Sequence, residues 1–129
     1  MEAASFDESS DTISAFSIDG QTGKLALLDK VASNGGDPAH VAVDASGHWV
    51  FAVNYNGGNV SMIQKNADLS LGAAVMTFPT GMNAHEIVFD PSSHFAFVPN
   101  KGSDDVSELV FDAKAGTIAP NTPLPEPHS

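Results

Sequence analysis

The side chains in this sequence that could do chemistry are few in kind. The chain has five histidines, and its five basic residues are all lysines, against 16 acidic residues and no cysteine. No histidine has a second one two or four positions away, so the spacing predicts no metal site. Asp104 and Asp105 do not match a calcium-binding EF-hand loop. A Ser-His-Asp triad stays open on composition, although no G-x-S-x-G nucleophile elbow occurs. The chemistry that remains is a histidine acting as a general base and a lysine binding an anion.

The elements that would position these groups follow from an internal repeat. Residues 44–61 align with residues 90–107 without a gap, at an offset of 46 residues. A third, partial copy appears when residues 13–25 are aligned with residues 106–118, at twice that period. A period of about 40 to 50 residues with several short apolar runs is typical of a four-stranded propeller blade.

We therefore expect an all-β fold, a partial β-propeller of about two to three four-stranded antiparallel blades. Closed propellers have about four to eight blades, so we expect an open arc and not a closed ring. The repeat predicts one domain with a blade remnant at 1–36, a blade at 37–82 and an incomplete blade at 83–129. The expected strands lie at 11–18, 24–31, 40–44, 49–55, 59–64, 70–78, 85–90, 94–99, 105–111 and from 117.

Two of these strands are apolar on both faces, as expected where a sheet packs against each side. They are the runs WVFAV and FAFVP, which begin at Trp49 and Phe95. Both aromatic residues are predicted to lie in the core. Asp44 and Asp90, each five residues before the start of its run, are predicted to form the turns that precede these runs.

Antiparallel strands sort the polar residues onto two opposite rims. The rim where the first strand of a blade starts and the second strand ends holds the ligand-facing candidates, which are Asp37, His40, Asn54, Tyr55, Asn56, Asn83, His85, Glu86, Asn100 and Lys101. His48 and His94 fall on the far rim with the turn-forming aspartates.

Composition excludes several classes of partner. The formal net charge is −11 and no basic stripe exists, so we expect neither nucleic acid nor a membrane surface as a partner. Residues 1–10 lack the basic start and apolar run of a secretory signal, and no run approaches transmembrane length. With no cysteine present, we expect a cytoplasmic location.

The repeats closely resemble one known family. The segments DPAHVAVDASGHWVFAVNYNGGNVS, AHEIVFDPSSHFAFVPNKGSDDVS and FDAKAGTIAPNTP are similar to the seven-bladed-propeller 6-phosphogluconolactonases, and the resemblance covers nearly the whole chain. It implies hydrolysis of a sugar lactone in the pentose phosphate pathway, without a metal or other cofactor. It also implies that this chain matches roughly the second to fourth of seven blades, and that His85 occupies the position of a family histidine.

We name His85 as the catalytic candidate and Lys101, Asn100, Glu86 and His40 as substrate-binding candidates. Lys101 has no counterpart in the repeat, where Tyr55 takes its place, so an anion-binding role is open to it. Asn100 superposes on Asn54, and a residue that recurs in every blade is usually architectural. His40 is shifted by one place and pairs with Glu86 in the repeat, which favours a structural role for it. His85 could equally fill a blade junction, and Lys101 could be an ordinary solvated lysine.

The resemblance also predicts groups that these residues do not supply. The family's next motif, a Pro-Arg-His segment, contributes an arginine, and an acidic residue follows one strand later; neither is present in the 129 residues. We therefore expect the chain alone to have little or no lactonase activity. Two alternatives stay open, a lactonising enzyme of the carboxymuconate-cyclase type and a non-catalytic module that self-associates through exposed apolar strands at 13–18 and 106–111.

Overall fold

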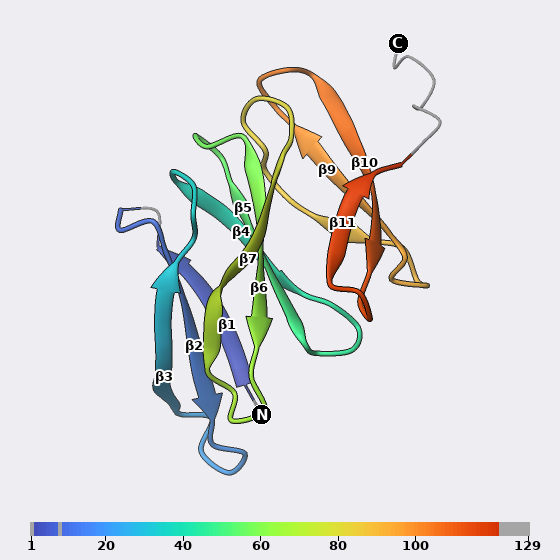
Figure 1. Ribbon diagram of the computed structural model, residues 1–129. Helices are drawn as coiled ribbons and strands as arrows, with labels where there is room; N and C mark the ends of the chain where they lie inside the picture. The colour runs from blue at the N-terminus through green and yellow to red at the C-terminus, as the bar shows by residue number, and fades with distance from the viewer. Residues whose placement is uncertain (1, 8, 122–129) are drawn as a thin grey trace.

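The computed structural model describes residues 2–7 and 9–121, and every regular element in this part of the chain is a β-strand (Figure 1). The strands form three antiparallel sheets, each with its strands in chain order. The first sheet contains β1 (Glu2–Asp7), β2 (Thr12–Ile18) and β3 (Leu25–Ala32). The middle sheet contains β4 (Pro38–Val43), β5 (Trp49–Asn54), β6 (Asn59–Lys65) and β7 (Leu71–Pro79). The last sheet contains β8 (Val88–Phe89), β9 (Phe95–Asn100), β10 (Asp105–Asp112) and β11 (Thr117–Pro120).

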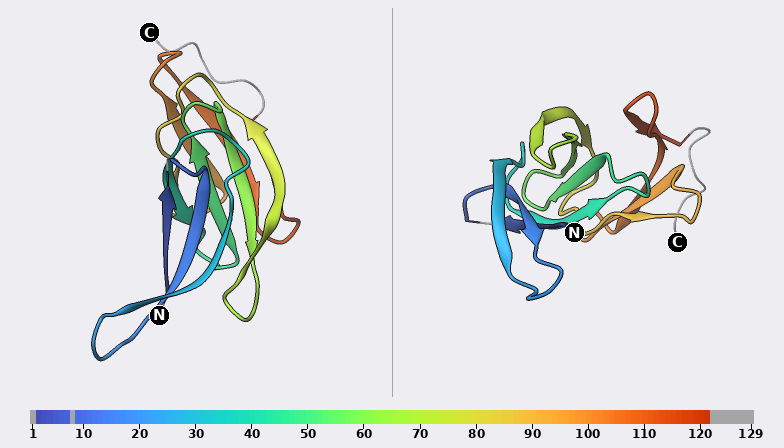
Figure 2. Two further views of the ribbon diagram at one scale, coloured as in Figure 1. Left: turned by 90° about the vertical axis from the view of Figure 1, so that its left-hand side faces the viewer. Right: turned by 90° about the horizontal axis from the view of Figure 1, so that it is seen from below.

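The three sheets follow one another side by side, as the view from below shows (Figure 2). They do not close into a barrel, and the predicted fold class, an all-β partial propeller, is confirmed. The described residues contain no helix long and apolar enough to cross a membrane.

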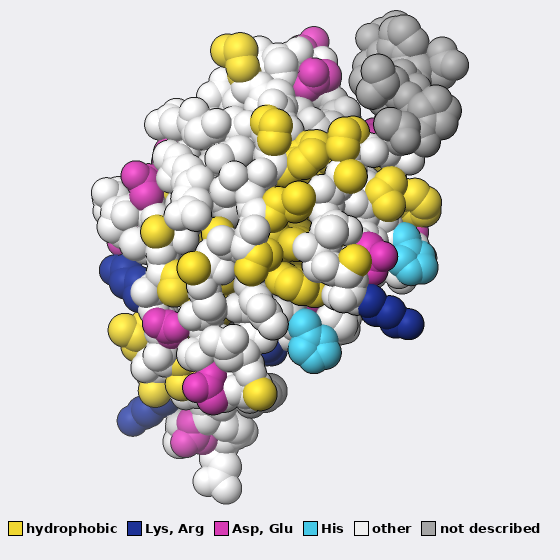
Figure 3. All heavy atoms as spheres, in the orientation of Figure 1, with side chains coloured by type: hydrophobic (Ala, Val, Ile, Leu, Met, Phe, Trp, Pro, Cys, Tyr) yellow, Lys and Arg dark blue, Asp and Glu magenta, His cyan; other side chains and the backbone are white. Residues whose placement is uncertain are grey.

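The middle sheet has a core on each face, as its doubly apolar β5 predicts. Val50 and Ala52 pack in a cluster with Ile13 of the first sheet. Phe51 and Val53 point the other way, into a larger cluster with the last sheet. Phe51 contacts two aromatic rings there in edge-to-face geometry, those of Phe89 and Phe111, each with its centroid 5.1 Å away. Hydrophobic side chains are also visible over the region between β7 and β11 (Figure 3).

The predicted turns between the first two strands of each blade are confirmed. The Asp44 carboxylate accepts hydrogen bonds from the backbone N–H groups of Ser46 and Trp49, at 3.2 and 2.9 Å. The Asp90 carboxylate accepts the equivalent bonds from Ser92 and Phe95, at 3.2 and 3.0 Å. The side-chain bond from Ser92, with these backbone bonds, lowers the pKa of Asp90 below its usual value. Both aspartates thus fix local backbone geometry.

Three expectations were wrong in detail. Strand β1 was not foreseen, although it pairs with β2 along its whole length. Strand β8 is two residues long, where six were expected. Phe95 is 40% exposed, because it lies on the face of β9 that no neighbouring sheet covers, whereas Trp49 is half-buried and donates from Nε1 to the Ala113 carbonyl at 2.9 Å.

The two apolar strands expected to be exposed at the ends of the arc are each covered by the middle sheet on one face only. Of the strands expected to be exposed, β2 buries Ile13 against the middle sheet, and β10 buries Leu109 and Phe111. On their other faces, Phe16 and Ile18 of β2 are half-buried and Val106 of β10 is 36% exposed. Leu25 and Leu27 of β3 are exposed as well.

Candidate functional site

A bulge at the start of each innermost strand sets the position of His85. In the middle sheet Pro38 pairs with Asn54 and His40 with Val53, so Ala39 is an extra residue on its strand. In the last sheet Ala84 bridges to Asn100 and Val88 pairs with Phe97, which also leaves one extra residue. The repeat places His85 where the middle sheet has Ala39. A bulge interrupts the ladder locally and can redirect a side chain.

His85 lies at the seam between the middle and last sheets. Its backbone N–H donates to the Pro99 carbonyl at 3.1 Å, which ties the bulge to β9. Its imidazole meets the ring of Tyr55 edge-on, with the centroids 6.3 Å apart and the planes at 77°. The His85 side chain is exposed. An imidazole held in this way can take up or give a proton at a solvent-accessible surface.

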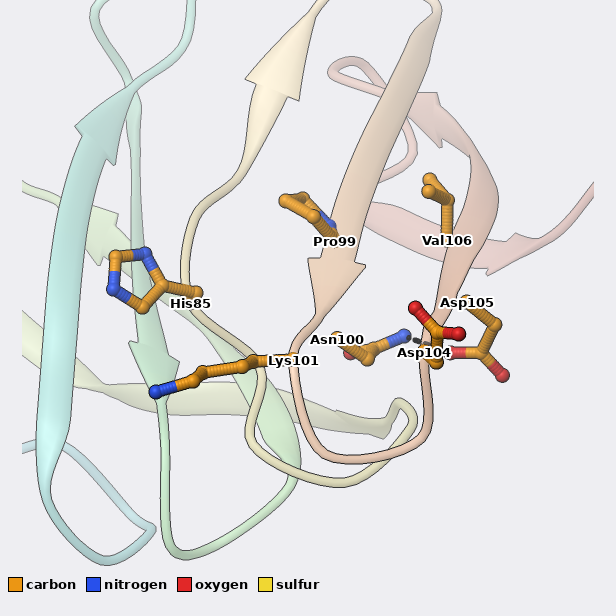
Figure 4. A pocket seen from close by; sticks show the side chains of 7 residues that line it. All are labelled: His85, Pro99, Asn100, Lys101, Asp104, Asp105 and Val106. Atoms are coloured by element: carbon orange, nitrogen blue, oxygen red, sulfur yellow. Dashed lines mark hydrogen bonds between the residues drawn. The ribbon is translucent and has the colours of Figure 1, made fainter.

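A hollow of about 620 Å³ lies beside this histidine and brings three of the five candidate residues together (Figure 4). His85, Asn100 and Lys101 line it with Pro99, Asp104, Asp105 and Val106. His85 and Lys101 extend toward the same side in the close-up view, whereas Asp104 and Asp105 lie on the side of β10. The hollow therefore combines one imidazole, one ammonium group and two carboxyl groups.

A backbone hydrogen bond that recurs in both complete sheets positions Lys101. Its backbone N–H donates to the Asn83 carbonyl at 3.0 Å, and the Tyr55 N–H donates to the Asp37 carbonyl at 2.8 Å. Asn83 and Asp37 both adopt left-handed backbone conformations, with φ of 58° and 60°. Asn and Asp tolerate this region better than most residues. The backbone is thus the same in both sheets, and the side chain alone differs.

Asn100 is buried and its amide group is held by the next strand. Its Nδ2 donates to Asp105 Oδ1 at 2.9 Å and to Ser107 Oγ at 3.0 Å. Asn54 makes the equivalent bonds to Asn59 Oδ1 at 2.8 Å and to Ser61 Oγ at 3.3 Å. The Oδ1 atom of each asparagine is buried without a partner among the described residues. Because both sheets share the arrangement, it supports an architectural role for Asn100 at the wall of the hollow.

His40 and Glu86 do not line the hollow. His40 Nδ1 accepts a hydrogen bond of 3.3 Å from the backbone N–H of Ile87, which links the middle sheet to the last. Burial lowers the pKa of His40 below the ordinary histidine value of 6.5; nearby Glu86 opposes this effect and His85 adds to it. These observations support the structural role favoured for His40. The Glu86 side chain is exposed.

The sequence interpretation did not select the acidic wall of the hollow. Asp105 takes the place of Asn59 in the repeat, and each accepts a hydrogen bond from the buried asparagine of its sheet. Alignment alone therefore predicts this structural role, whereas the position of Asp105 beside the hollow depends on the folded loop. No group of three or more potential metal ligands occurs among the described residues.

Comparison with known proteins defines the family. A family model described as a seven-bladed β-propeller lactonase matches residues 3–127. The chain belongs to this lactonase family.

Individual relatives narrow the similarity. A 6-phosphogluconolactonase from Bacillus subtilis (strain 168) is 34% identical over 102 residues, which cover 78% of this chain and 29% of the relative. A candidate 6-phosphogluconolactonase from Bacteroides uniformis has a crystal structure that matches with a TM-score of 0.80 and 27% identity, covering 94% of this chain and 38% of that one. The periplasmic gluconolactonase of Pseudomonas aeruginosa shares the fold, with a TM-score of 0.73 and 20% identity over 87% of this chain and 37% of that one. The chain thus spans less than half the length of these relatives.

Proposed function

We propose that this chain supplies part of the substrate site of a 6-phosphogluconolactonase, which opens a sugar lactone in the pentose phosphate pathway of the cytoplasm. The similarity to the Bacillus subtilis enzyme supports the substrate class. The observation that carries the proposal is the hollow of the last sheet, where the bulge places His85 and the neighbouring β9–β10 loop places Lys101.

The proposed chemistry needs no cofactor. Water adds to the lactone carbonyl carbon, the ring C–O bond breaks, and the products are a carboxylate and a free hydroxyl group. His85 takes the proton of the attacking water, or donates to the oxygen on which negative charge develops. Lys101 attracts the phosphate group of the substrate.

The charge of the hollow limits what this chain does alone. Asp104 and Asp105 line the same hollow as Lys101, and the chain carries a net charge of −11. The two carboxylates and the negative net charge of the chain each repel a phosphate dianion. We therefore expect weak substrate binding and a hydrolysis rate close to the spontaneous rate for the 129-residue chain.

Two measurements on the purified chain test the proposal. Hydrolysis of 6-phosphogluconolactone is compared with the spontaneous reaction, and binding of the stable product 6-phosphogluconate is followed through backbone amide shifts. We expect small shifts centred on His85 and Lys101. Lys101→Ala should abolish them, whereas Lys114→Ala, which removes an exposed lysine from the opposite rim, should leave them unchanged.

The histidine has its own control. His85→Asn should reduce any hydrolysis above the spontaneous rate, whereas His94→Asn on the far rim should not. Shifts centred on the far rim, or equal effects of the two lysine variants, would contradict the proposed site. Rapid turnover by this chain would contradict our inference that its cationic groups alone do not bind the substrate strongly enough for catalysis.

A further inference from the structure

Two sheet faces at opposite ends of the arc expose apolar side chains. The last outer face is the uncovered side of the last sheet, formed by Val88, Phe95, Phe97 and Val106. The first outer face is the uncovered side of the first sheet, where the half-buried Phe16 and Ile18 pair with the exposed Leu27 and Leu25. Leu25 and Leu27 are 57% and 60% exposed, and Phe95 and Phe97 are 40% and 39% exposed. Exposed apolar faces of this kind mark interaction surfaces.

The last outer face repeats a face that the molecule already uses. At an offset of 46 residues, its members Val88, Phe95, Phe97 and Val106 align, in that order, with Ala42, Trp49, Phe51 and Val60 of the middle sheet. All four of those residues pack in the core cluster between the middle and last sheets. The last outer face is thus a second copy of the surface onto which the last sheet docks.

The first outer face repeats the opposite half of the same interface. An offset of 93 residues carries Phe16, Ile18 and Leu25 onto the last sheet, at Leu109, Phe111 and Ile118. These three residues are buried in that same core cluster, on the side of the last sheet that faces the middle sheet. The molecule therefore presents one half of its own internal interface at each end.

We infer that the last outer face of one copy docks onto the first outer face of a second copy, and that the contact reproduces the packing between the middle and last sheets. Such a contact is head-to-tail, because the two surfaces that meet are different. The seven-bladed geometry of the family limits the assembly to two copies. Two copies occupy six of seven places, and a third copy needs three places where one remains.

One sequence difference between the repeats should make the contact between two copies weaker than the contact between the middle and last sheets. Glu108 takes the place of Met62, a fully buried member of the internal cluster, and is paired with Phe97 in the ladder. A carboxylate at an apolar interface carries a desolvation cost. The dimer should therefore dissociate on dilution.

Sedimentation velocity of the 129-residue chain between about 1 and 100 µM tests the assembly. We expect a monomer at the low end and a dimer at the high end. A monomer throughout this range, or species larger than a dimer, would overturn the inference.

Charge substitutions on the two faces test the head-to-tail arrangement. Phe97→Glu and Leu25→Glu should each raise the dissociation constant at least about 100-fold, because each places an unpaired carboxylate in the contact. Val75→Glu alters an exposed apolar residue of the middle sheet outside both faces, and should leave the dimer unchanged.

The decisive measurement mixes the two variants. Each variant retains the face that the other has lost, so an equal mixture should form dimers although neither variant does alone. Recovery of the dimer also shows that both variants are folded. A variant that still dimerises alone would indicate symmetric pairing of like faces and would refute the inference.

Discussion

Two histidines at the seam between the middle and last sheets have different surroundings. The ring of His40 is half-buried and accepts the Ile87 N–H, whereas the His85 side chain is exposed beside the hollow. Because a ring nitrogen that accepts a hydrogen bond is unprotonated, the bond and the burial of His40 both favour its neutral form. His40 is therefore a pH-sensitive link between two sheets.

The lowered pKa of His40 predicts a loss of stability in acid. The folded chain binds this proton less readily than the unfolded chain, so the contribution of His40 to stability is full above about pH 6.5 and declines as the pH falls toward the folded-state value. We expect the difference in unfolding free energy between the wild-type chain and His40→Asn to shrink between pH 7.5 and pH 5, on urea denaturation.

His48→Asn provides the control for that prediction, because His48 is exposed on the opposite rim. The wild-type chain and this variant should keep a constant difference over the same pH range. A pH-independent difference for His40→Asn would show that protonation of His40 is not linked to unfolding.

The family resemblance marked His85 as a candidate, and a departure from the repeat marked Lys101. His85 stands where the other complete sheet has Ala39, and Lys101 stands where it has Tyr55. Comparison within one sequence can detect such differences. It cannot detect that Ile87 donates to His40, because that bond joins two sheets across 47 residues.

At the scale of elements, one loop module recurs in both complete sheets. The segment before the innermost strand packs a glycine against the buried asparagine that ends the next strand. A Cβ atom at Gly35 would lie 2.5 Å from Asn54 Cγ, and one at Gly81 would lie 2.8 Å from Asn100 Cγ. The glycines thus allow the loops to approach the asparagines closely.

This close approach predicts that added methyl groups are destabilising. Gly35→Ala and Gly81→Ala should each lower the unfolding free energy by about 1–3 kcal/mol, because buried polar groups would have to move. Gly20→Ala is the matched control, since a Cβ at Gly20 meets nothing within 4 Å. Urea denaturation of the three variants measures the difference, and equal stabilities would contradict the close-packing argument.

Local chemistry explains which elements were predictable. The Asp44 and Asp90 turns are specified by short-range hydrogen bonds to residues at most five positions away, so their sequence pattern is sufficient. The short β8 was not predictable from the repeat, because the equivalent β4 has the same one-residue register shift and is still six residues long. The strand β1 lies outside residues 13–25, the partial copy detected in the sequence, so its pairing with β2 went unrecognised.

At the scale of the whole molecule, the position of a sheet in the arc determines whether an equivalent residue is buried. Phe51 and Phe97 occupy the same place in the repeat, yet Phe51 is fully buried between two sheets and Phe97 is 39% exposed. The apolar pattern of β9 is typical of a strand that is covered by a sheet on both faces. Whether a cover exists depends on the neighbouring sheet, which is why Phe95 was wrongly assigned to the core.

This contrast predicts unequal effects of the same substitution at two equivalent positions. Phe51→Ala should cost about 3–5 kcal/mol, because it opens a cavity and removes the edge-to-face contacts with Phe89 and Phe111. Phe97→Ala should cost less than about half as much, because its ring is already partly hydrated. Urea denaturation of both variants should be measured at a protein concentration at which the chain is monomeric, so that dissociation of a dimer does not contribute to the free energy of unfolding. Equal losses at the two positions would mean that the last outer face is covered in the isolated chain, and the arrangement of three sheets with two free ends would be wrong.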